Sequence, residues 1–428
     1  MTQAEQAIYR KNIERIAGYI ASGCKQSQCL GVEFENILVH KADGSPVAYD
    51  GPHGVEQILE RLSATYPEKT CQDGHVLGLQ GGNATITLEP AACLEYSAGP
   101  FTTIDQVKDS LEQFRATLDP ILDEFGLEVA DLGYHPSACA QELSLIPKKR
   151  YEAMSRYLGE IGPYGACMMR GSASLQVSLD YTSEEDAIKK LRLVDTLAPL
   201  LSLLCDNSPI FEKKRAHQHM VRTLIWKNYD PARCMVIPHT FDDSFGFRDY
   251  AEFAYNQAAI IAPHSDGSWS YAGSTTFAQL YRDRLMEDAD IEHALSMIFP
   301  DGRLKRFLEI RPADALPKPY ALAYVALLKG VYYNENNLDE LSAAFARAHV
   351  NEERIAKAKE SLMSKGYDGC AYDRRPAEWL EMVFEAAQRG LSEEEAVYLA
   401  PLHDLVCQEQ TLAQRYPEDF YTHYLGLR

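Results

Sequence analysis

Two short acidic pairs lie inside strand-like sequence, one at Glu33-Phe34-Glu35 and one running from Glu89 to Glu95. Side chains alternate between the two faces of a strand, so the even spacing of each pair places both carboxylates on one face. Carboxylates gathered on one face repel each other and lose solvation, and a bound cation relieves both costs. Together the pairs indicate a phosphate-handling site with several metal ions, whereas a single E-x-E more often marks a solvated strand face.

Two further segments, residues 172–180 and 306–312, also alternate polar with apolar side chains. Their polar positions include Ser174, Gln176, Glu309 and Arg311. Strands with one polar face are typical of antiparallel sheets, whereas parallel strands are usually apolar on both faces. Because helices are mixed among the strands, the sequence favours an α+β fold over a doubly wound parallel sheet.

Apolar periodicity and capping residues predict the individual elements. We expect helices at 3–22, 54–64, from the Thr103–Gln106 capping box onward and at 183–205, and strands at 31–40, 84–89, 93–97, 127–132, 172–180 and 306–312. No linker interrupts the chain, so we expect a single catalytic domain over residues 1–428. Its core should lie at 25–318, with a helical C-terminal part at 319–428.

Charge and composition limit the partners of the chain. The net charge of −20 opposes binding to nucleic acid or to an anionic membrane. The chain also has no run of about 18 apolar residues, the length needed to span a bilayer. The ten cysteines are scattered without a C-x-x-C pair, and the N-terminus lacks a signal-peptide pattern. We therefore expect a cytoplasmic protein with packed thiols, and a Cys24–Cys29 disulfide is the open alternative.

The polar strand faces supply many oxygen donors and almost no Cys or His. The candidate metal ligands are Glu33, Glu35, Glu89, Glu95, Gln176 and Glu309. Such oxygens suit Mg²⁺ or Mn²⁺ and do not suit zinc. The Arg311 guanidinium matches phosphate oxygens, although a cross-strand salt bridge with Glu309 is the alternative. There is no P-loop motif, and Gly81-Gly82 is typical of a hairpin turn.

Several of these segments resemble glutamate–cysteine ligases of the plant and proteobacterial type. The matching blocks, in family order, are residues 31–35, 87–97, 172–180, 241–247 and 298–314, which include G-x-E-x-E and E-P-x-x-x-x-E patterns. Arg222-Thr-Leu-Ile-Trp226 is similar to an R-x-x-I-W segment of the same family. The ordered set is far more specific than any one block.

The resemblance implies a glutamine-synthetase-like fold, in which an antiparallel β-sheet funnel with surrounding helices holds ATP and two or three Mg²⁺ ions. It implies ATP-dependent amide formation through an acyl phosphate. The six oxygen donors above match metal-ligand positions, and Arg311, with Glu309, matches the catalytic position near the transferred phosphate. Arg222 and Trp226 match the glutamate pocket, and Arg170 and Ser174 are further candidates for substrate binding.

Departures from the family pattern concentrate in the substrate wall. Ala91-Ala92-Cys93 replaces Gly-Gly-Gln, so we expect that loop to take another path. A family Tyr corresponds to Ile260, with Tyr255 as a candidate substitute, and Arg170 and Pro312 also fit the pattern poorly. Activation of a carboxylate by phosphorylation is therefore a firmer inference than the identity of either amino acid.

The leading hypothesis is a ligase that makes γ-glutamylcysteine, a step of glutathione biosynthesis. The alternatives are a related ligase that joins glutamate or another acid to a different amine, and a nucleotide-binding homologue without catalysis. The expected partners are small molecules, with no nucleic acid and no membrane. We also expect Glu35→Gln or Glu309→Gln to stop turnover and to leave the fold intact.

Overall fold

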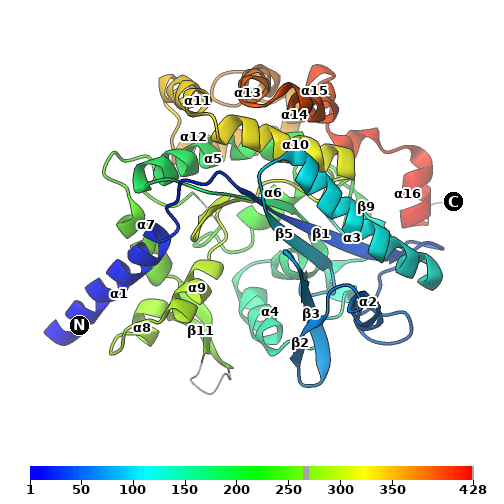
Figure 1. The fold of residues 1–428 in the computed structure, drawn as a ribbon, viewed down its shortest axis with the longest axis horizontal. Helices are drawn as coiled ribbons and strands as arrows, with labels where there is room; N and C mark the ends of the chain where they lie inside the picture. The colour runs from blue at the N-terminus through cyan, green and yellow to red at the C-terminus, as the bar shows by residue number, and fades with distance from the viewer. Residues whose placement is uncertain (235, 264–268, 427–428) are drawn as a thin grey trace.

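The computed structural model describes residues 1–234, 236–263 and 269–426, and its centre is a large antiparallel sheet (Figure 1). From edge to edge its strands are β12 (Gly302–Leu304), β13 (Leu308–Ile310), β7 (Leu175–Leu179), β1 (Leu30–His40), β5 (Leu94–Phe101), β4 (Ala84–Leu88), β3 (His75–Gly81) and β2 (Glu68–Gln72). Off this path, β6 (Leu127–Ala130) pairs with the end of β1. Two small hairpins stand apart, β8 (Ile210–Phe211) with β9 (Lys214–Arg215), and β10 (Ala258–Pro263) with β11 (Trp269–Thr276).

Helices surround this sheet. In chain order they are α1 (Gln3–Ala21), α2 (Val55–Leu62), α3 (Ile104–Phe125), α4 (Lys149–Ile161), α5 (Glu184–Leu204), α6 (Val221–Lys227), α7 (Phe247–Tyr255), α8 (Phe277–Leu280), α9 (Asp288–Ser296), α10 (Lys318–Tyr332), α11 (Glu335–Arg347), α12 (Glu352–Lys365), α13 (Pro376–Gly390), α14 (Glu393–Ala396), α15 (Ala400–Cys407) and α16 (Glu418–Leu425). The antiparallel pairing of the strands and the many helices confirm the expected α+β class.

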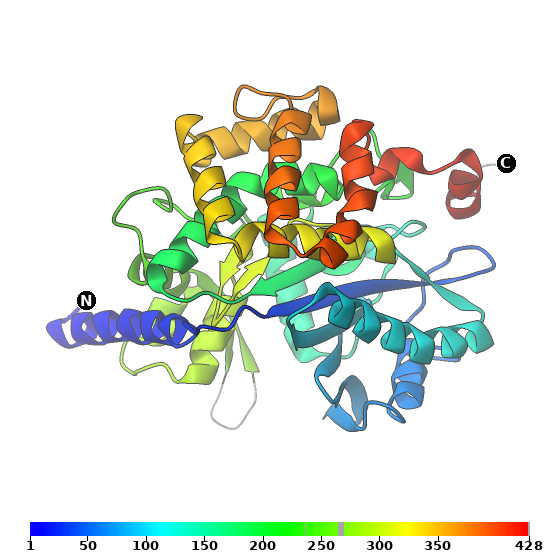
Figure 2. The ribbon, with the colours of Figure 1, turned by 45° about the horizontal axis from the view of Figure 1, so that its top comes forward.

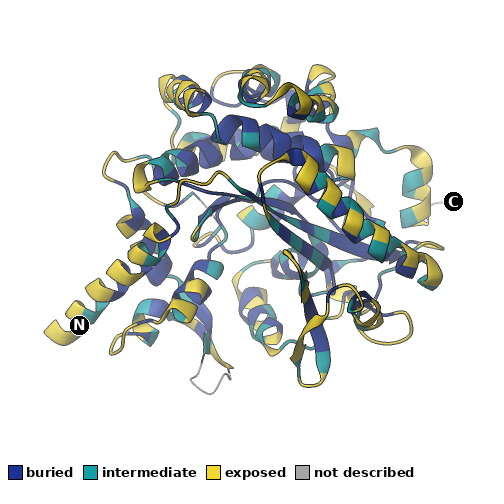
Figure 3. Ribbon diagram, in the orientation of Figure 1, coloured by how far each residue is buried: buried dark blue, intermediate teal, exposed yellow. Residues whose placement is uncertain are grey.

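One helical layer covers the apolar side of the sheet. Helix α10 is apolar on nearly its whole circumference and lies between α3 and the outer helices α11, α13 and α15 (Figures 1 and 2). A helix of that composition has to be buried, and Figure 3 shows it as the most completely covered of the C-terminal helices. Helix α10 is therefore the inner helix of the C-terminal part, and α11, α13 and α15 pack on it.

The polar side of the sheet faces the opposite way. Along β1, Val32 and Phe34 enter the core, whereas Glu33 and Glu35 point to the other face. Side chains of α4 and α6 and the segment after α9 close over this second face and leave a cavity there. The alternation of the β1 sequence thus separates a structural face from a functional one.

The predicted elements are largely confirmed. Ile13, Ile16 and Ile20 form the buried stripe of α1, and the Thr103 capping box opens α3. The strands expected at 172–180 and 306–312 are shorter, because only Leu175–Leu179 and Leu308–Ile310 keep ladder pairing. No helix in the described parts of the chain combines the length and apolar character needed to cross a membrane.

The cysteines are all free, so the Cys24–Cys29 disulfide is absent. The prediction that all ten thiols are packing residues is wrong for Cys71, Cys370 and Cys407, which are exposed.

Candidate active site

The strand register places carboxylates directly opposite one another. Glu35 on β1 faces Glu95 on β5, and Glu33 faces Gln176 on β7. Like charges at directly opposed positions of an antiparallel pair are destabilising, so the Glu35–Glu95 pair carries a cost in the absence of a cation. The β1 pair is therefore not a solvated strand face but the floor of a cavity.

Glu89 reaches the same cavity by a different route from the expected one. It lies just after β4 in the turn that leads to β5, where its N–H donates to the Cys93 carbonyl at 2.9 Å. The even-spacing argument is therefore wrong for the Glu89–Glu95 pair, because Pro90 and the turn interrupt the strand between them. A hairpin instead brings both carboxyls to the same cavity.

The environments of Glu33, Glu35 and Glu89 favour the protonated forms of these three carboxyls. Burial, together with the nearby Glu309 and Glu95 charges, raises the pKa of Glu33 from 4.5 to about 8. Burial also raises the pKa of Glu35 and of Glu89, and neighbouring carboxylates add to both shifts. Carboxyls packed this closely ionise together only when positive charge compensates them.

The donor set fits divalent cations. Each of the half-buried Glu33, Glu35, Glu89 and Glu95 side chains lines the one cavity, and the donors are hard oxygens. Among the described residues, no three of these carboxyls have oxygens within 4.8 Å of one another. That spacing fits Mg²⁺, which usually takes one or two carboxylates and completes its shell with water and phosphate.

This arrangement predicts how the metal-free protein responds to pH. Between about pH 4.5 and 8 the folded chain keeps the Glu33 proton, whereas the unfolded chain has released it. Stability should therefore fall as the pH rises through this window, by up to about 1.4 kcal/mol per pH unit for this carboxyl. Denaturant unfolding at several pH values should show this fall, and Mg²⁺ should reverse more of it at pH 8 than at the acidic end. A denaturation midpoint that rises across the same window would contradict the prediction.

Glu309 sits in the opposite electrostatic setting. Its fully buried carboxylate accepts hydrogen bonds from Arg303 and Arg311 at 2.7 Å and from Lys305 at 3.1 Å. These cations hold the pKa of Glu309 well below its usual value. The β12–β13 hairpin creates the cluster, because Arg303 is the ladder partner of Glu309. Of the two readings of the Glu309–Arg311 pair, the structure shows a salt bridge, buried and not on the surface.

Arg311 connects this cluster to the carboxylate floor. Its Nη1 donates to the side-chain oxygen of Gln176, and the Gln176 amide nitrogen donates to Glu35 at 3.0 Å. Ser174 holds the same carboxylate, with its backbone N–H and its hydroxyl each 2.7 Å from a Glu35 oxygen. In this structure Ser174 therefore positions Glu35.

The remaining predicted residues divide into two groups. Arg222 and Trp226, one turn apart on α6, both line the carboxylate cavity, and Arg222 is almost completely buried, with an Nε that has no partner among the described residues. Arg170 does not line this cavity, because its guanidinium donates to the Leu143 carbonyl and the Ser155 hydroxyl at 3.0 Å. The structure therefore does not bring Arg170 to the site.

Comparison with known proteins decides the family. The sequence model of the glutamate-cysteine ligase family 2 (GCS2) matches residues 29–419, which is most of the chain. This chain belongs to glutamate–cysteine ligase family 2 and is an enzyme of that ligase family.

Curated relatives agree with this assignment to family 2, and a solved structure shows the same fold. The chloroplastic glutamate–cysteine ligase of Brassica juncea is 29% identical over 391 residues, which cover 83% of this chain and 75% of that protein. Chloroplastic glutamate–cysteine ligase B of Oryza sativa subsp. japonica is 30% identical, over 80% of this chain and 70% of that protein. The crystal structure of glutamate–cysteine ligase from Francisella tularensis in complex with AMP has a TM-score of 0.52, with 13% identity, over 90% of this chain and 82% of that one. The glutamine-synthetase-like fold expected from the sequence is thereby confirmed.

The structure shows the backbone conformation at two positions where this family 2 ligase departs from the family's sequence pattern. Ala92 adopts a left-handed φ of 65°, so the loop takes at this position a conformation that glycine adopts without strain. Ile260 also has a left-handed φ, of 62°, which is rare for a β-branched residue. Tyr255 is buried against Asn12 and Tyr281 and does not line the carboxylate cavity. It is therefore no substitute for the missing family Tyr.

The sequence analysis did not identify four Lys and Arg side chains that belong to the site of this family 2 ligase. Lys148 and Arg150 line the carboxylate cavity, and Arg303 and Lys305 hold Glu309. A signal existed for each pair, since Lys148 and Arg150 lie in a basic run and Arg303 and Lys305 alternate like Glu309 and Arg311. Which carboxylates these cations meet was not visible in the sequence.

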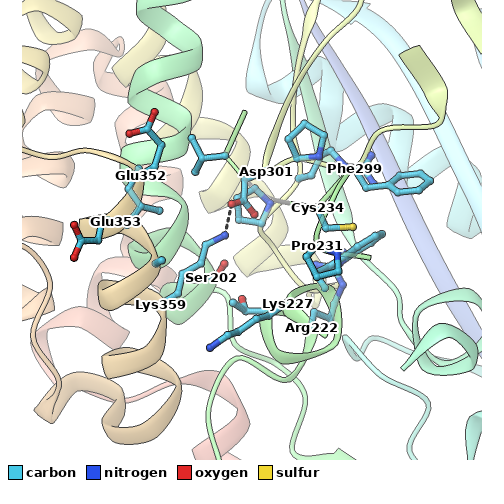
Figure 4. A pocket seen from close by; sticks show the side chains of 18 residues that line it. Ser202, Arg222, Lys227, Pro231, Cys234, Phe299, Asp301, Glu352, Glu353 and Lys359 are labelled. Atoms are coloured by element: carbon cyan, nitrogen blue, oxygen red, sulfur yellow. Dashed lines mark hydrogen bonds and ion pairs between the residues drawn. The ribbon is translucent and has the colours of Figure 1, made fainter. Parts of the chain in front are cut away.

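Several larger cavities share lining residues with the carboxylate cavity, and two of them could admit substrates. One, the apolar cavity, has a volume of about 560 Å³ and a mostly apolar surface between charged side chains. It shares Arg222, Trp226, Phe299 and Arg311 with the carboxylate cavity (Figure 4). Figure 4 shows the residues of this cavity between the sheet and α12, where the Asp301–Lys359 ion pair joins α12 to the segment before β12. The other, the cationic cavity, has a volume of about 660 Å³ and is lined by four Lys and Arg side chains. It shares Arg150 and Ser296 with the carboxylate cavity. The site of this family 2 ligase can therefore be approached from two sides.

Proposed function

We propose that this chain is an ATP-dependent ligase that joins the side-chain carboxylate of glutamate to an amine, with cysteine as the leading candidate. The observation that carries the proposal is the buried cluster of Glu33, Glu35, Glu89 and Glu95 beside the arginines Arg222 and Arg311. The first group suits metal–phosphate complexes and the second suits carboxylate and phosphoryl oxygens. The names of the relatives support glutamate and cysteine as substrates.

The chemistry that we propose has two balanced steps. A carboxylate oxygen of glutamate attacks the γ-phosphorus of ATP, the bond to the β-phosphate oxygen breaks, and ADP leaves an acyl phosphate behind. The amine nitrogen then attacks the acyl carbon, inorganic phosphate departs, and the amine loses a proton. Bound Mg²⁺ would neutralise the phosphate charge near Glu33, Glu35, Glu89 and Glu95, with Gln176 and Glu309 as the remaining candidate ligands.

The protein's own groups would supply orientation and charge for these steps. Arg311 is fixed by Glu309 and Gln176, so its guanidinium is pre-oriented for the transferred phosphoryl group. Arg222 donates from Nη1 to the Ala313 carbonyl, which leaves its unpartnered Nε as a donor for a substrate carboxylate. Trp226 packs against Tyr229 and Phe299 and forms an aromatic wall that limits the water around the reacting groups.

Of the two neighbouring cavities, the cationic one is the better candidate for binding the nucleotide. It contains Lys25, Arg150, Lys305 and Arg306, in a chain whose net charge of −20 otherwise repels ATP. Trp269 and Phe307 add aromatic surface to the same cavity. The AMP complex of the Francisella relative supports nucleotide binding in this fold. The amino-acid substrates would then approach through the apolar cavity behind Trp226.

This assignment predicts a selective effect of Arg150→Met. Arg150 lines both the cationic and the carboxylate cavities, and its buried Nε has no partner among the described residues. Removing the charge should raise the KM for ATP at least about tenfold, the size of one charge-assisted contact, and leave the KM for glutamate nearly unchanged. Arg156→Met on the exposed side of the same helix is the matched control. Equal changes in both KM values would contradict a nucleotide role.

Phosphate release from ATP, measured across a panel of amines, tests the function itself. We expect release to need Mg²⁺, glutamate and an amine together, with the fastest release when cysteine is the amine. Release with another amine but none with cysteine would show a related ligase with a different acceptor. Tight ATP binding with no product from any amine would instead show a nucleotide-binding homologue.

A further inference from the structure

A cluster far from the proposed active site brings three metal-ligating side chains together. Glu381 on α13 lies beside His403 and Cys407 on α15, and one ligand atom of each lies within 4.8 Å of the others. His403 Nε2 is 2.8 Å from a Glu381 oxygen, and Cys407 Sγ is 4.0 Å from Nε2 and 3.9 Å from the second Glu381 oxygen. No other such group of three occurs in the parts of the chain that the structure describes.

Local structure holds two of the three groups in place. His403 and Cys407 are four residues apart on one helix, which puts both side chains on the same face. The ring of Phe384 packs against the His403 ring with centroids 4.9 Å apart, which restricts the imidazole. Helices α13 and α15 contact each other, so Glu381 approaches from a fixed neighbour and not from a loop.

The donor chemistry differs from that of the carboxylate cavity. One soft thiolate, one borderline imidazole and one hard carboxylate form a mixed set of the kind that Zn²⁺ accepts, whereas Mg²⁺ requires oxygen ligands. Three protein ligands can hold zinc when water takes the fourth position, as in catalytic zinc sites, and the partly exposed cluster leaves room for that water.

We propose that Glu381, His403 and Cys407 form a zinc site that links α13 to α15 in the outer helical layer. The site is independent of the ligase chemistry, because it is built from residues outside the carboxylate cavity and its two neighbours. Its expected effect is to fix the outer helices that pack on α10. The alternative is an exposed Glu381–His403 ion pair with a thiol nearby.

Cobalt substitution tests the site in the full-length protein. We expect one equivalent of Co²⁺, added with reductant and excess Mg²⁺ to occupy the carboxylate cavity, to produce a thiolate-to-cobalt charge-transfer band. Zn²⁺ should displace the cobalt, since it binds such sites more tightly. Cys407→Ser should abolish the band, and His403→Ala should weaken cobalt binding at least about tenfold.

The control is Cys370→Ser, which removes another exposed thiol outside the cluster and should leave the band unchanged. Zn²⁺ should also raise the thermal midpoint of the wild-type chain and not that of Cys407→Ser, since a ligand that binds only the folded state stabilises it. Absence of the band from the wild-type protein would overturn the proposal. A band that survives Cys407→Ser would overturn it equally, because the thiolate would then come from elsewhere.

Discussion

Glu33→Gln should reduce turnover at least about 100-fold, more than the loss typical of a group that only supports a metal ligand. The same change should leave the metal-free protein at least as stable at neutral pH as the wild type. The reason is that burial and the neighbouring carboxylates raise the pKa of Glu33 to about 8, so its folded form is already largely uncharged there. Replacing the carboxyl by a neutral amide therefore costs little stability in the metal-free state. It reduces turnover because metal binding needs a charged ligand.

Steady-state turnover and denaturant unfolding without metal measure these two effects. Glu33→Gln should also flatten the fall in stability between pH 4.5 and 8, because the titrating group is gone. Glu68→Gln, at an exposed position on β2 of the same sheet, is the control and should change neither property. Near-normal turnover in Glu33→Gln would remove the metal-site assignment for this residue.

Glu309→Gln should lower both turnover and the free energy of unfolding, the latter by about 3–5 kcal/mol. The variant leaves Arg303, Lys305 and Arg311 around a neutral amide in a fully buried location. Uncompensated buried charge is among the most costly single changes in a protein. The sequence-based expectation that this substitution spares the fold is therefore revised.

Denaturant midpoints measured at neutral pH check this loss of stability. Glu360→Gln breaks the exposed Lys227–Glu360 pair, whose atoms are 2.6 Å apart, and is the matched control. That surface pair should contribute less than about 1 kcal/mol. If Glu309→Gln loses no more stability than Glu360→Gln, the side chains of Arg303, Lys305 and Arg311 must find other partners. The proposed rigid setting of Arg311 would then be wrong.

The contrast between Glu33 and Glu309 shows what the amino-acid pattern could not reveal. Both are alternating acidic residues on strands, and both were assigned as metal ligands for the same reason. The hairpin β12–β13 surrounds Glu309 with cations, whereas β1 and β5 oppose carboxylate to carboxylate. The two side chains therefore have opposite pKa shifts and opposite expected effects on stability.

The substrate-binding predictions separate in a similar way. Arg222 and Trp226 share a helix face, a local property that spacing determines, and both line the cavity. Ser174 lies in a block that resembles the family and Arg170 lies just before that block. In the structure Arg170 bonds to Leu143 and Ser155, and Ser174 holds Glu35. Hydrogen bonds between distant segments decide such roles, and a linear pattern does not encode them.

The sequence alone determined the α+β class, the approximate positions of the helices and strands that it predicted, and the acidic character of the site. Those properties depend on local alternation, capping and side-chain type, which neighbouring residues set. Only the tertiary structure decided which charges meet, because contacts such as that between Arg311 and Gln176 join residues 135 positions apart. The electrostatic balance of the site is a sum over such long-range contacts, and small shifts in register would change its sign.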